Sequence, residues 1–321
     1  MNLRALRYFV SVAQIGSITK ASQVLNVAQP ALSRQIRQLE QELDVSLLKR
    51  HARGIELTDG GTMLLERAQS IINMLQRTTE DLKSKPAVAA GRLSLGVPPA
   101  TGLLLTPDLV RRFRTDVPQI SLHIKEGVGS SLVEWVLDKR LDLAVVHNPP
   151  QHPDLRIEPL VTERMVLVLP MPEVKPNWQL PKGGEVTLRE IACLPLILPS
   201  LPHTNRLLLD SVTARGGEYL HPVIEVDSVA ITKLMVAQGL GATILTYAAV
   251  HGEVENATLQ TVAIERPPLI SRLSVACSNT HPNPAKLNLT TEIIRSTIAE
   301  LIRHGVFRGA LGSSRIHRTV K

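Results

Sequence analysis

Segment 28–50, AQPALSRQIRQLEQELDVSLLKR, decides how the N-terminal part of this chain folds. Placed on a helix at about 100° per residue, its apolar residues fall on one narrow stripe, which consists of Leu32, Ile36, Leu39 and Leu43. The opposite face has no carboxylate and consists of Pro30, Ser33, Arg34 and Arg37. A solvated helix face in a chain of mixed charge usually includes an acid. We therefore expect this face to meet an anion.

The residues before this segment predict a shorter helix and a tight turn. Ser17 is a good N-cap, and the inward residues after it are Ile18, Ala21, Val24 and Leu25. Asn26 can take the left-handed conformation that ends a helix, and Pro30 suits the first turn of the next one. Two short helices joined so closely form a helix-turn-helix, whose second helix enters the major groove of duplex DNA.

The side chains of the acid-free face have the chemistry that DNA requires. The side-chain amide of Gln29 can pair with adenine, and the Ser33 hydroxyl can hydrogen-bond to a phosphate or a base edge. Guanidinium groups can bind phosphates or guanine. The next segment, LLKRHARGIEL (47–57), predicts a two-stranded wing that meets backbone phosphates. The residues predicted to contact DNA are Gln29, Pro30, Ser33, Arg34, Arg37, Lys49, Arg50 and Arg53.

Residues 9–61, FVSVAQIGSITKASQVLNVAQPALSRQIRQLEQELDVSLLKRHARGIELTDGG, resemble the winged helix-turn-helix of LysR-type transcriptional regulators. The resemblance implies a linker helix and an effector domain of two Rossmann-like subdomains, similar to type 2 periplasmic binding proteins. It also implies a homodimer or homotetramer on double-stranded promoter DNA, a small-molecule co-inducer, no other cofactor, and RNA polymerase as a further partner. One departure is Ala28, where the family often has a Ser or Thr cap, at a cost of about 1 kcal/mol.

The pattern along the chain divides it into four parts. Residues 1–58 are predicted to form an all-α winged helix-turn-helix domain, and residues 59–90 a linker or dimerisation helix with a hinge. Residues 91–305 alternate strand-like and helix-like segments, which predicts a bilobed α/β domain. The basic tail, 306–321, is expected to be disordered. The expected lobe boundaries are about 91–163 and 267–305 for lobe 1, and about 164–266 for lobe 2.

Ligands of doubly wound sheets bind beyond the C-terminal ends of strands, near helix N-termini whose N–H groups attract anions. Four loops fit this rule: PPAT (98–101), GVGSS (127–131), HNPP (147–150) and SLPHTNR (200–206). In the last loop, His203 and Arg206 favour a small organic acid or another anion. The residues predicted to bind the effector are Pro99, Ala100, Thr101, Gly129, Ser130, His147, Asn148, His203, Thr204 and Arg206.

An enzyme, or a solute-binding protein with an appended DNA-binding domain, is the competing interpretation. The sequence has no G-x-S-x-G elbow, no P-loop and no H-E-x-x-H, so we predict no catalytic residue and no metal site. An exported solute-binding protein needs a signal peptide, whereas the first 17 residues have the spacing of an amphipathic helix.

Composition and cysteine usage agree with a DNA-binding protein of the cytoplasm. The formal charge of +7 is compatible with an anionic partner, and 2% aromatic residues argue against a stacking platform for single strands. The distant Cys193 and Cys277 fit a reducing compartment and argue against a redox pair. Because no run approaches the ~18 apolar residues of a membrane span, we expect no membrane partner.

Overall fold

The computed structural model describes residues 1–51, 54–83, 91–181, 183–265 and 267–312. The chain forms two compact units, Met1–Lys85 and Pro86–Lys321. The boundary between these units lies inside segment 59–90, where the sequence predicts a linker.

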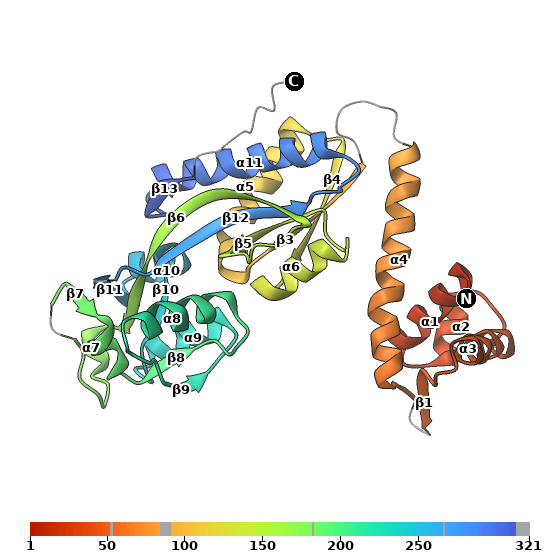
Figure 1. Ribbon diagram of the computed structural model, residues 1–321, viewed down its shortest axis with the longest axis horizontal. Helices are drawn as coiled ribbons and strands as arrows, with labels where there is room; N and C mark the ends of the chain where they lie inside the picture. Colours follow the sequence, from red (N-terminus) through yellow and green to blue (C-terminus); the bar gives the residue numbers. More distant parts are fainter. Residues whose placement is uncertain (52–53, 84–90, 182, 266, 313–321) are drawn as a thin grey trace. The chain divides into compact units, whose positions relative to one another are not determined.

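The first unit is a helical bundle with a two-stranded wing (Figure 1). Its elements are α1 (Leu3–Ile15), α2 (Ile18–Val24), α3 (Gln29–Leu43), β1 (Leu48–His51), β2 (Gly54–Leu57) and α4 (Asp59–Lys83). Two helices begin at side-chain caps, because Asn2 accepts from the Ala5 amide at 2.9 Å and Ser17 from the Lys20 amide at 3.3 Å. Asn26 has φ of 55°, the left-handed conformation predicted for the turn between α2 and α3.

The apolar stripe of α3 forms the core of this unit. Leu32 and Ile36 are fully buried and Leu39 is 1% exposed, and all three pack in one cluster with Phe9 of α1. Burial of each such side chain contributes about 1.5–3 kcal/mol. This stripe therefore fixes the orientation of α3 and leaves its opposite face in solvent.

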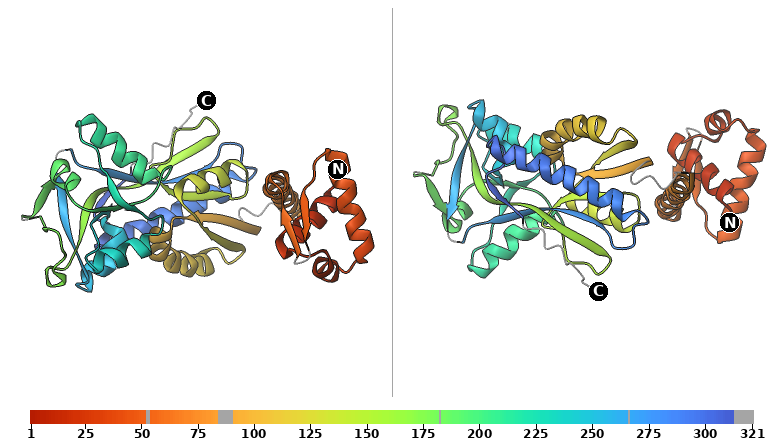
Figure 2. Two further views of the ribbon diagram at one scale, coloured as in Figure 1. Left: turned by 90° about the horizontal axis from the view of Figure 1, so that it is seen from below. Right: turned by 90° about the horizontal axis from the view of Figure 1, so that it is seen from above.

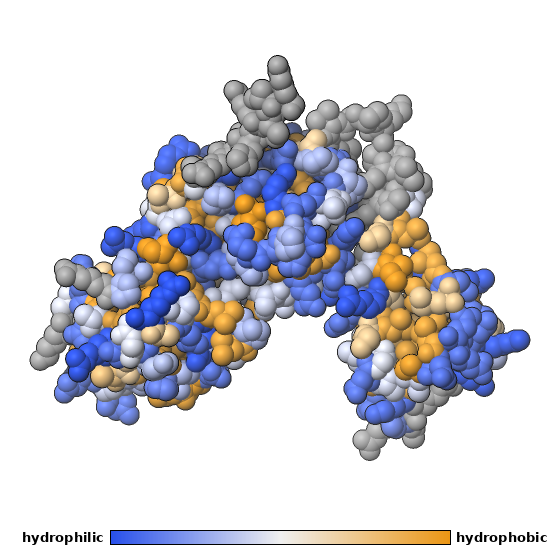
Figure 3. Space-filling model, in the orientation of Figure 1, coloured by the Kyte–Doolittle hydropathy of each residue, from blue (hydrophilic) through white to orange (hydrophobic). Residues whose placement is uncertain are grey.

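The linker helix α4 carries apolar side chains on its surface. Figure 3 shows an apolar patch over this helix. Its exposed members are Met63, Ile71, Met74 and Leu75. An exposed apolar patch of this kind is typical of a surface that pairs with another chain. The predicted dimerisation helix therefore has a suitable face.

The second unit contains all the remaining elements. Its strands are β3 (Gly91–Val97), β4 (Ile120–Glu126), β5 (Leu143–His147), β6 (Leu155–Pro170), β7 (Glu185–Thr187), β8 (Leu196–Leu198), β9 (Pro222–Glu225), β10 (Thr243–Thr246), β11 (Leu259–Glu265), β12 (Ile270–Ser278) and β13 (Gly309–Leu311). Its helices are α5 (Pro99–Asp116), α6 (Gly129–Leu137), α7 (Leu188–Ala192), α8 (Thr204–Arg215), α9 (Val229–Ala237), α10 (Tyr247–Glu255), α11 (Pro284–Arg303) and the 3-10 turn η1 (Pro172–Val174).

The long strand β6 belongs to both lobes. Its first part pairs antiparallel with β12, and its second part pairs antiparallel with β10 and β11. The strand order of the main sheet is β4-β3-β5-β12-β6-β11-β7, with β3 parallel to β4 and β5. Helix α11 packs beside α5 over lobe 1 (Figures 1 and 2). The predicted crossing strand, RMVLVLP, is the second half of β6, and the chain returns to lobe 1 as β12.

The C-terminal segment corrects one expectation. A disordered tail was expected from residue 306, but Phe307 is 2% exposed in the core of lobe 1, and β13 pairs with β6. Glycine makes this pairing possible, since a Cβ on Gly309 would lie 2.2 Å from the Thr162 carbonyl oxygen. The basic composition of the tail concealed this apolar anchor. The rest of the expected tail, 313–321, lies outside the described residues.

Among the described residues, no helix is both long enough and apolar enough to cross a membrane. The same residues contain no group of three His, Cys, Asp or Glu side chains that could hold a metal ion. Cys193 is exposed at the end of α7 in lobe 2, whereas Cys277 is buried in β12 of lobe 1.

Candidate functional site

The first candidate surface is the outer face of α3. Gln29 and Pro30 in its first turn are exposed, as are Arg34 and Arg37 farther along the helix. Ala28 precedes the helix without a side-chain cap, so the first N–H groups of α3 are not capped by a side chain and can donate to a phosphate. Four of the predicted DNA-contacting residues therefore share one surface.

Ser33 does not share this surface. It is 4% exposed, because it lies only about 100° around the helix from Leu32 and packs at the edge of the buried stripe. The guanidinium of Arg37 reaches its hydroxyl at 3.4 Å. The expectation that Ser33 presents its hydroxyl on the exposed face is therefore wrong, and Arg37 covers it instead.

The wing has the predicted antiparallel form. In register, Lys49 lies opposite Glu56 and Arg50 opposite Ile55, and the Lys49 side chain is exposed. Only the backbone of Arg50 is described, and Arg53 lies outside the described residues.

The second candidate site is the cleft between the two lobes. Helices α5 and α6 of lobe 1 and α8, α9 and α10 of lobe 2 all contribute N-terminal residues to a small cavity of about 40 Å³. The N-termini of α5, α6 and α10 have no side-chain cap. The lining residues are Pro98, Pro99, Ala100, Thr101, Val128, Gly129, His147, His203, Thr204, Asn205, Val229, Leu245, Thr246 and Ala249.

His147 lies at the centre of the polar contacts of this cleft. Its Nε2 lies 2.9 Å from the Thr101 hydroxyl, and its Nδ1 lies 3.0 Å from the Ser271 hydroxyl. Burial, together with the nearby His203, lowers the pKa of His147 to about 4. At neutral pH this imidazole is therefore uncharged, and it can donate one hydrogen bond and accept another.

His203 has a structural role at the start of α8. Its Nδ1 accepts a hydrogen bond from the Asn205 amide at 3.2 Å, so this nitrogen carries no proton. Burial lowers the pKa of His203, and the nearby carboxylate of Asp227 opposes that change. His203 thus lines the cleft as a neutral ring.

Arg206 was predicted to bind the effector, but it does not line the cleft. Its side chain pairs with Asp210 at 3.0 Å and with Glu225 at 2.9 Å, and it also donates to the Pro199 carbonyl oxygen at 3.1 Å. None of these partners lines the cleft, and the two carboxylates neutralise the guanidinium. The cleft consequently contains no lysine or arginine among the residues that line it.

Ser130 and Asn148 line a neighbouring cavity of about 450 Å³ that shares Thr204 with the cleft. Asn148 joins the lobes, because its amide nitrogen lies 3.4 Å from the Asn205 side-chain oxygen. The lobes also touch where a Cβ on Gly129 would lie 2.8 Å from the Thr204 hydroxyl. An effector larger than a few atoms therefore needs either this second cavity or a wider separation of the lobes.

Seven of the ten predicted effector residues line the cleft, and sequence reasoning missed several others. It also missed Ser271 of β12, which does not line the cleft itself but whose hydroxyl lies within hydrogen-bond distance of the His147 ring. Asn205 and Thr246 line the cleft but were not predicted. Asn205 directly follows the predicted Thr204, whereas Thr246 lies among apolar residues that do not indicate a binding site. A search for polar residues within apolar strands could have found Ser271.

Two family matches together span most of the chain. Residues 3–62 match the family described as "Bacterial regulatory helix-turn-helix protein, lysR family". Residues 86–299 match the "LysR substrate binding domain". The chain belongs to the LysR family of transcriptional regulators.

Relatives of known name agree with this assignment. The HTH-type transcriptional regulator BbuR of Bordetella bronchiseptica is 33% identical over 304 residues, covering 95% of this chain and 92% of that protein. The nitrogen assimilation regulatory protein nac of Escherichia coli is 31% identical over 246 residues, covering 76% and 78%. The solved structure of full-length CbnR, in complex with its target DNA, has the same fold at 22% identity. Its TM-score is 0.71 over 92% of this chain and 100% of that chain.

These findings confirm that this LysR-type regulator is a transcription factor with an effector-binding domain and not an enzyme. They also confirm the predicted fold classes, a helix-turn-helix domain followed by an α/β effector domain.

Proposed function

We propose that this LysR-type regulator binds a small organic acid in the cleft between its lobes and reads promoter DNA with the exposed face of α3. The observation that carries the acid proposal is the convergence of uncapped helix N-termini on the pair of Thr101 and His147. Each N-terminus presents N–H donors and a partial positive charge of about half a unit. A carboxylate is the organic group that best satisfies such donors.

The neutral state of the histidines defines the kind of acid. With His147 and His203 uncharged and Arg206 paired elsewhere, the cleft attracts an anion through dipoles and hydrogen bonds rather than through a formal positive charge. Such a site favours one carboxylate over a polyanion, because several negative charges would need matching cations. We therefore expect a monocarboxylate.

Titration of the full chain tests this proposal. A monocarboxylate effector should raise the melting temperature, and its uncharged amide should not. Thr101→Val should weaken the affinity for the acid by about tenfold, because it removes one hydroxyl near the ligand. Thr101→Ser keeps the hydroxyl and serves as the control. A library in which only neutral compounds stabilise the protein would refute an acidic effector.

For DNA, we propose that Gln29, Pro30, Arg34 and Arg37 enter the major groove and that Lys49 contacts the backbone from the wing. Two copies joined through α4, or four in a tetramer, would present two such helices to a pseudo-palindromic promoter site in the cytoplasm. Movement of the lobes around β6 when the acid binds would change the spacing of these helices and so the recruitment of RNA polymerase.

The assigned face of α3 can be tested by removing one charge. Arg34→Ala should weaken promoter binding by about 1–3 kcal/mol without changing thermal stability. Arg111→Ala removes the same charge from an exposed position on α5 of the other unit and is the matched control. Equal loss of promoter affinity in both variants, measured by fluorescence anisotropy, would show that net charge alone is read and would refute the assignment.

A further inference from the structure

A groove adjoins the effector cleft, between α6 of lobe 1 and α8 of lobe 2. This groove is the cavity of about 450 Å³ that shares Thr204 with the cleft, and the cleft itself is only about 40 Å³. The smaller volume holds a group of a few atoms, whereas the larger one is typical of a small-molecule site. The part of an effector that the cleft cannot hold therefore has a place beside it.

The groove and the cleft are lined by neighbouring residues of the same loops. In one loop Gly129 lines the cleft and Ser130 lines the groove. In another, His147 lines the cleft and Asn148 lines the groove. Thr204, at the start of α8, lines both. A molecule held by one end in the cleft can therefore extend along α6 and α8 into the groove.

The polar contact at the boundary between the groove and the cleft is weak. The side-chain oxygen of Asn148 accepts from the Arg272 amide at 2.9 Å, which fixes the orientation of this side chain. Its amide nitrogen has long contacts, 3.4 Å to the Asn205 side-chain oxygen and 3.5 Å to the Ser271 hydroxyl. Hydrogen bonds from N–H donors are normally 2.7–3.2 Å long. A ligand that passes this boundary therefore disrupts little, and its oxygen atoms can accept from Asn148.

The walls of the groove are mainly apolar, and none of the described residues that line it carries a charge. One face of α8 forms one wall, with residues spaced by three or four positions: Thr204, Leu207, Leu208 and Ser211. Val133, one turn after Ser130 on α6, lies in the opposite wall. Leu207 is 51% exposed, so much of its apolar surface is available to a ligand.

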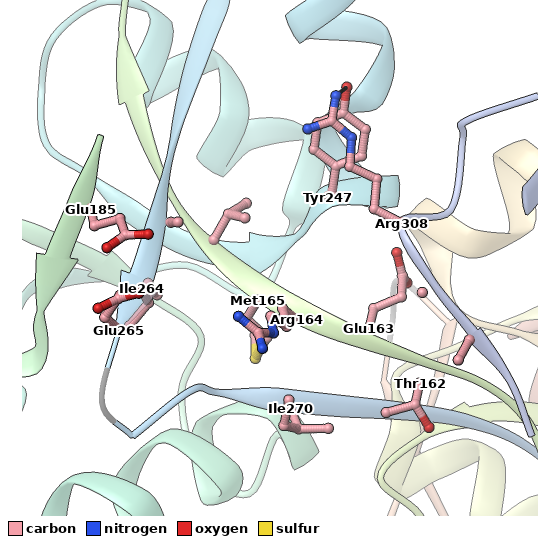
Figure 4. Close-up of a pocket in the computed structure, with 14 residues that line it drawn as sticks. Thr162, Glu163, Arg164, Met165, Glu185, Tyr247, Ile264, Glu265, Ile270 and Arg308 are labelled. Carbon is pink, nitrogen blue, oxygen red and sulfur yellow. Dashed lines mark hydrogen bonds between the residues drawn. The ribbon is translucent and has the colours of Figure 1, made fainter. Parts of the chain in front are cut away.

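The cavity beside β6 has a different chemistry. It has a volume of about 440 Å³, and charged side chains surround it, among them Arg164, Glu185, Glu265 and Arg308 (Figure 4). An apolar group bound there would displace water from charged side chains without replacing its hydrogen bonds, which is costly. The groove between α6 and α8, and not the cavity beside β6, therefore suits an uncharged part of a ligand.

We propose that the effector is an amphipathic monocarboxylate, whose carboxylate binds in the cleft and whose apolar tail lies in the groove between α6 and α8. This inference rests on the acid site proposed above and specifies the rest of the molecule. Thr204 to Ser211 spans about 10 Å along α8, which sets the length of tail that the groove can cover. A second charge on the tail would have no partner in the groove.

The tail would also distinguish the effector from other small anions. It would contact α6 of lobe 1 and α8 of lobe 2 together, so it would favour the arrangement in which both walls of the groove touch it. An acid without a tail, such as acetate, would occupy the cleft without this contribution. Short acids would therefore compete with the effector while stabilising the closed lobes less.

Calorimetric titration of the full chain with acetate, butanoate, hexanoate and octanoate tests the tail. Affinity should rise about fourfold for each added methylene that the groove buries. Hexanedioate, which would place a second carboxylate in the groove, should bind about tenfold or more weakly than hexanoate. Equal affinity along the series, or equal binding of hexanedioate, would overturn the tail and leave the acid site in place. Failure of every acid to bind would overturn the acid site and the tail with it.

Variants locate the tail. Leu207→Ala should weaken hexanoate binding roughly fivefold or more and leave acetate binding unchanged, because only the tail reaches this side chain. Thr101→Val should instead weaken both acids alike. Leu103→Ala removes the same kind of exposed side chain from α5, outside the groove, and is the matched control.

A change of specificity gives a second measurement. Leu207→Asp should bind 6-aminohexanoate more tightly than hexanoate, the reverse of the wild-type order, because its carboxylate would pair with the ammonium group at the end of the tail. Sedimentation of the Leu207 variants reports whether the groove is instead an interface between copies. An altered oligomeric state with unchanged hexanoate affinity would refute the proposal, as would an unchanged order of the two acids.

Discussion

Replacing Glu163 with glutamine should remove a large pH dependence from the stability of the effector-binding unit. Burial raises the pKa of this carboxyl from its ordinary value of 4.5 to about 7, while the backbone amides of Arg308 and Ala248 oppose the rise. A carboxyl whose pKa is higher in the folded state stabilises the fold while it is protonated. This contribution to the free energy of unfolding is complete below pH 4.5 and is lost as the pH rises through 7. A pKa difference of this size between the folded and unfolded states corresponds to roughly 3 kcal/mol in the free energy of unfolding.

Glutamine retains a carbonyl oxygen that accepts hydrogen bonds but cannot ionise. We therefore expect the variant to gain roughly 2–3 kcal/mol relative to the wild-type protein between about pH 4.5 and pH 8.5. Urea unfolding followed by tryptophan fluorescence reports on this unit alone, since Trp135 and Trp178 are the two tryptophans of the chain and both lie in it. Glu126→Gln, at an exposed position of β4, is the control. Parallel pH profiles for wild type and Glu163→Gln would refute the reasoning.

Three further substitutions have defined outcomes. Gly309→Val should displace β13 from β6, because its Cβ would collide with the Thr162 carbonyl oxygen. We expect the free energy of unfolding to fall by about 1–3 kcal/mol and amide exchange along that edge of β6 to become faster. Unchanged exchange would contradict the pairing. Arg206→Ala should cost about 1–3 kcal/mol in urea unfolding and leave effector affinity unchanged, since its carboxylate partners lie outside the cleft; a large loss of affinity would contradict this. Leu32→Ala should cost about 2–5 kcal/mol, lower the helical circular dichroism of the first unit on heating, and abolish promoter binding; retained binding at 37 °C would contradict it.

Local rules predicted the first unit well. The stripe through Leu32 and Ile36, the cap at Ser17 and the turn at Asn26 depend on residues within a few positions of one another, and the structure has each of them. The error at Ser33 arose at the edge of the stripe, where a small polar side chain is compatible with either burial or exposure. Helical periodicity alone does not decide such a position.

The cleft could be predicted only in part, because its contacts join distant segments. The loops that follow the strands could be located from the strand and helix pattern, which led to Thr101 and His147. The hydrogen bond from His147 to Ser271 spans 124 residues and depends on β12 pairing with β5. The partners of Arg206 likewise follow from how β9 packs beside α8, and no local pattern reveals that a cation is already paired.

The inward-facing helix ends of the cleft also affect the protein when no effector is bound. The N-termini of α5 and α6 in lobe 1 confront those of α8 and α10 in lobe 2, and each carries positive partial charge. Like charges that face one another across a narrow gap repel, so an effector anion of the kind proposed above would act as a shared counterion and would allow the lobes to close. On that proposal, the resting position of the lobes would depend on ionic strength, and abundant small anions in the cell would set the background against which a specific acid is sensed.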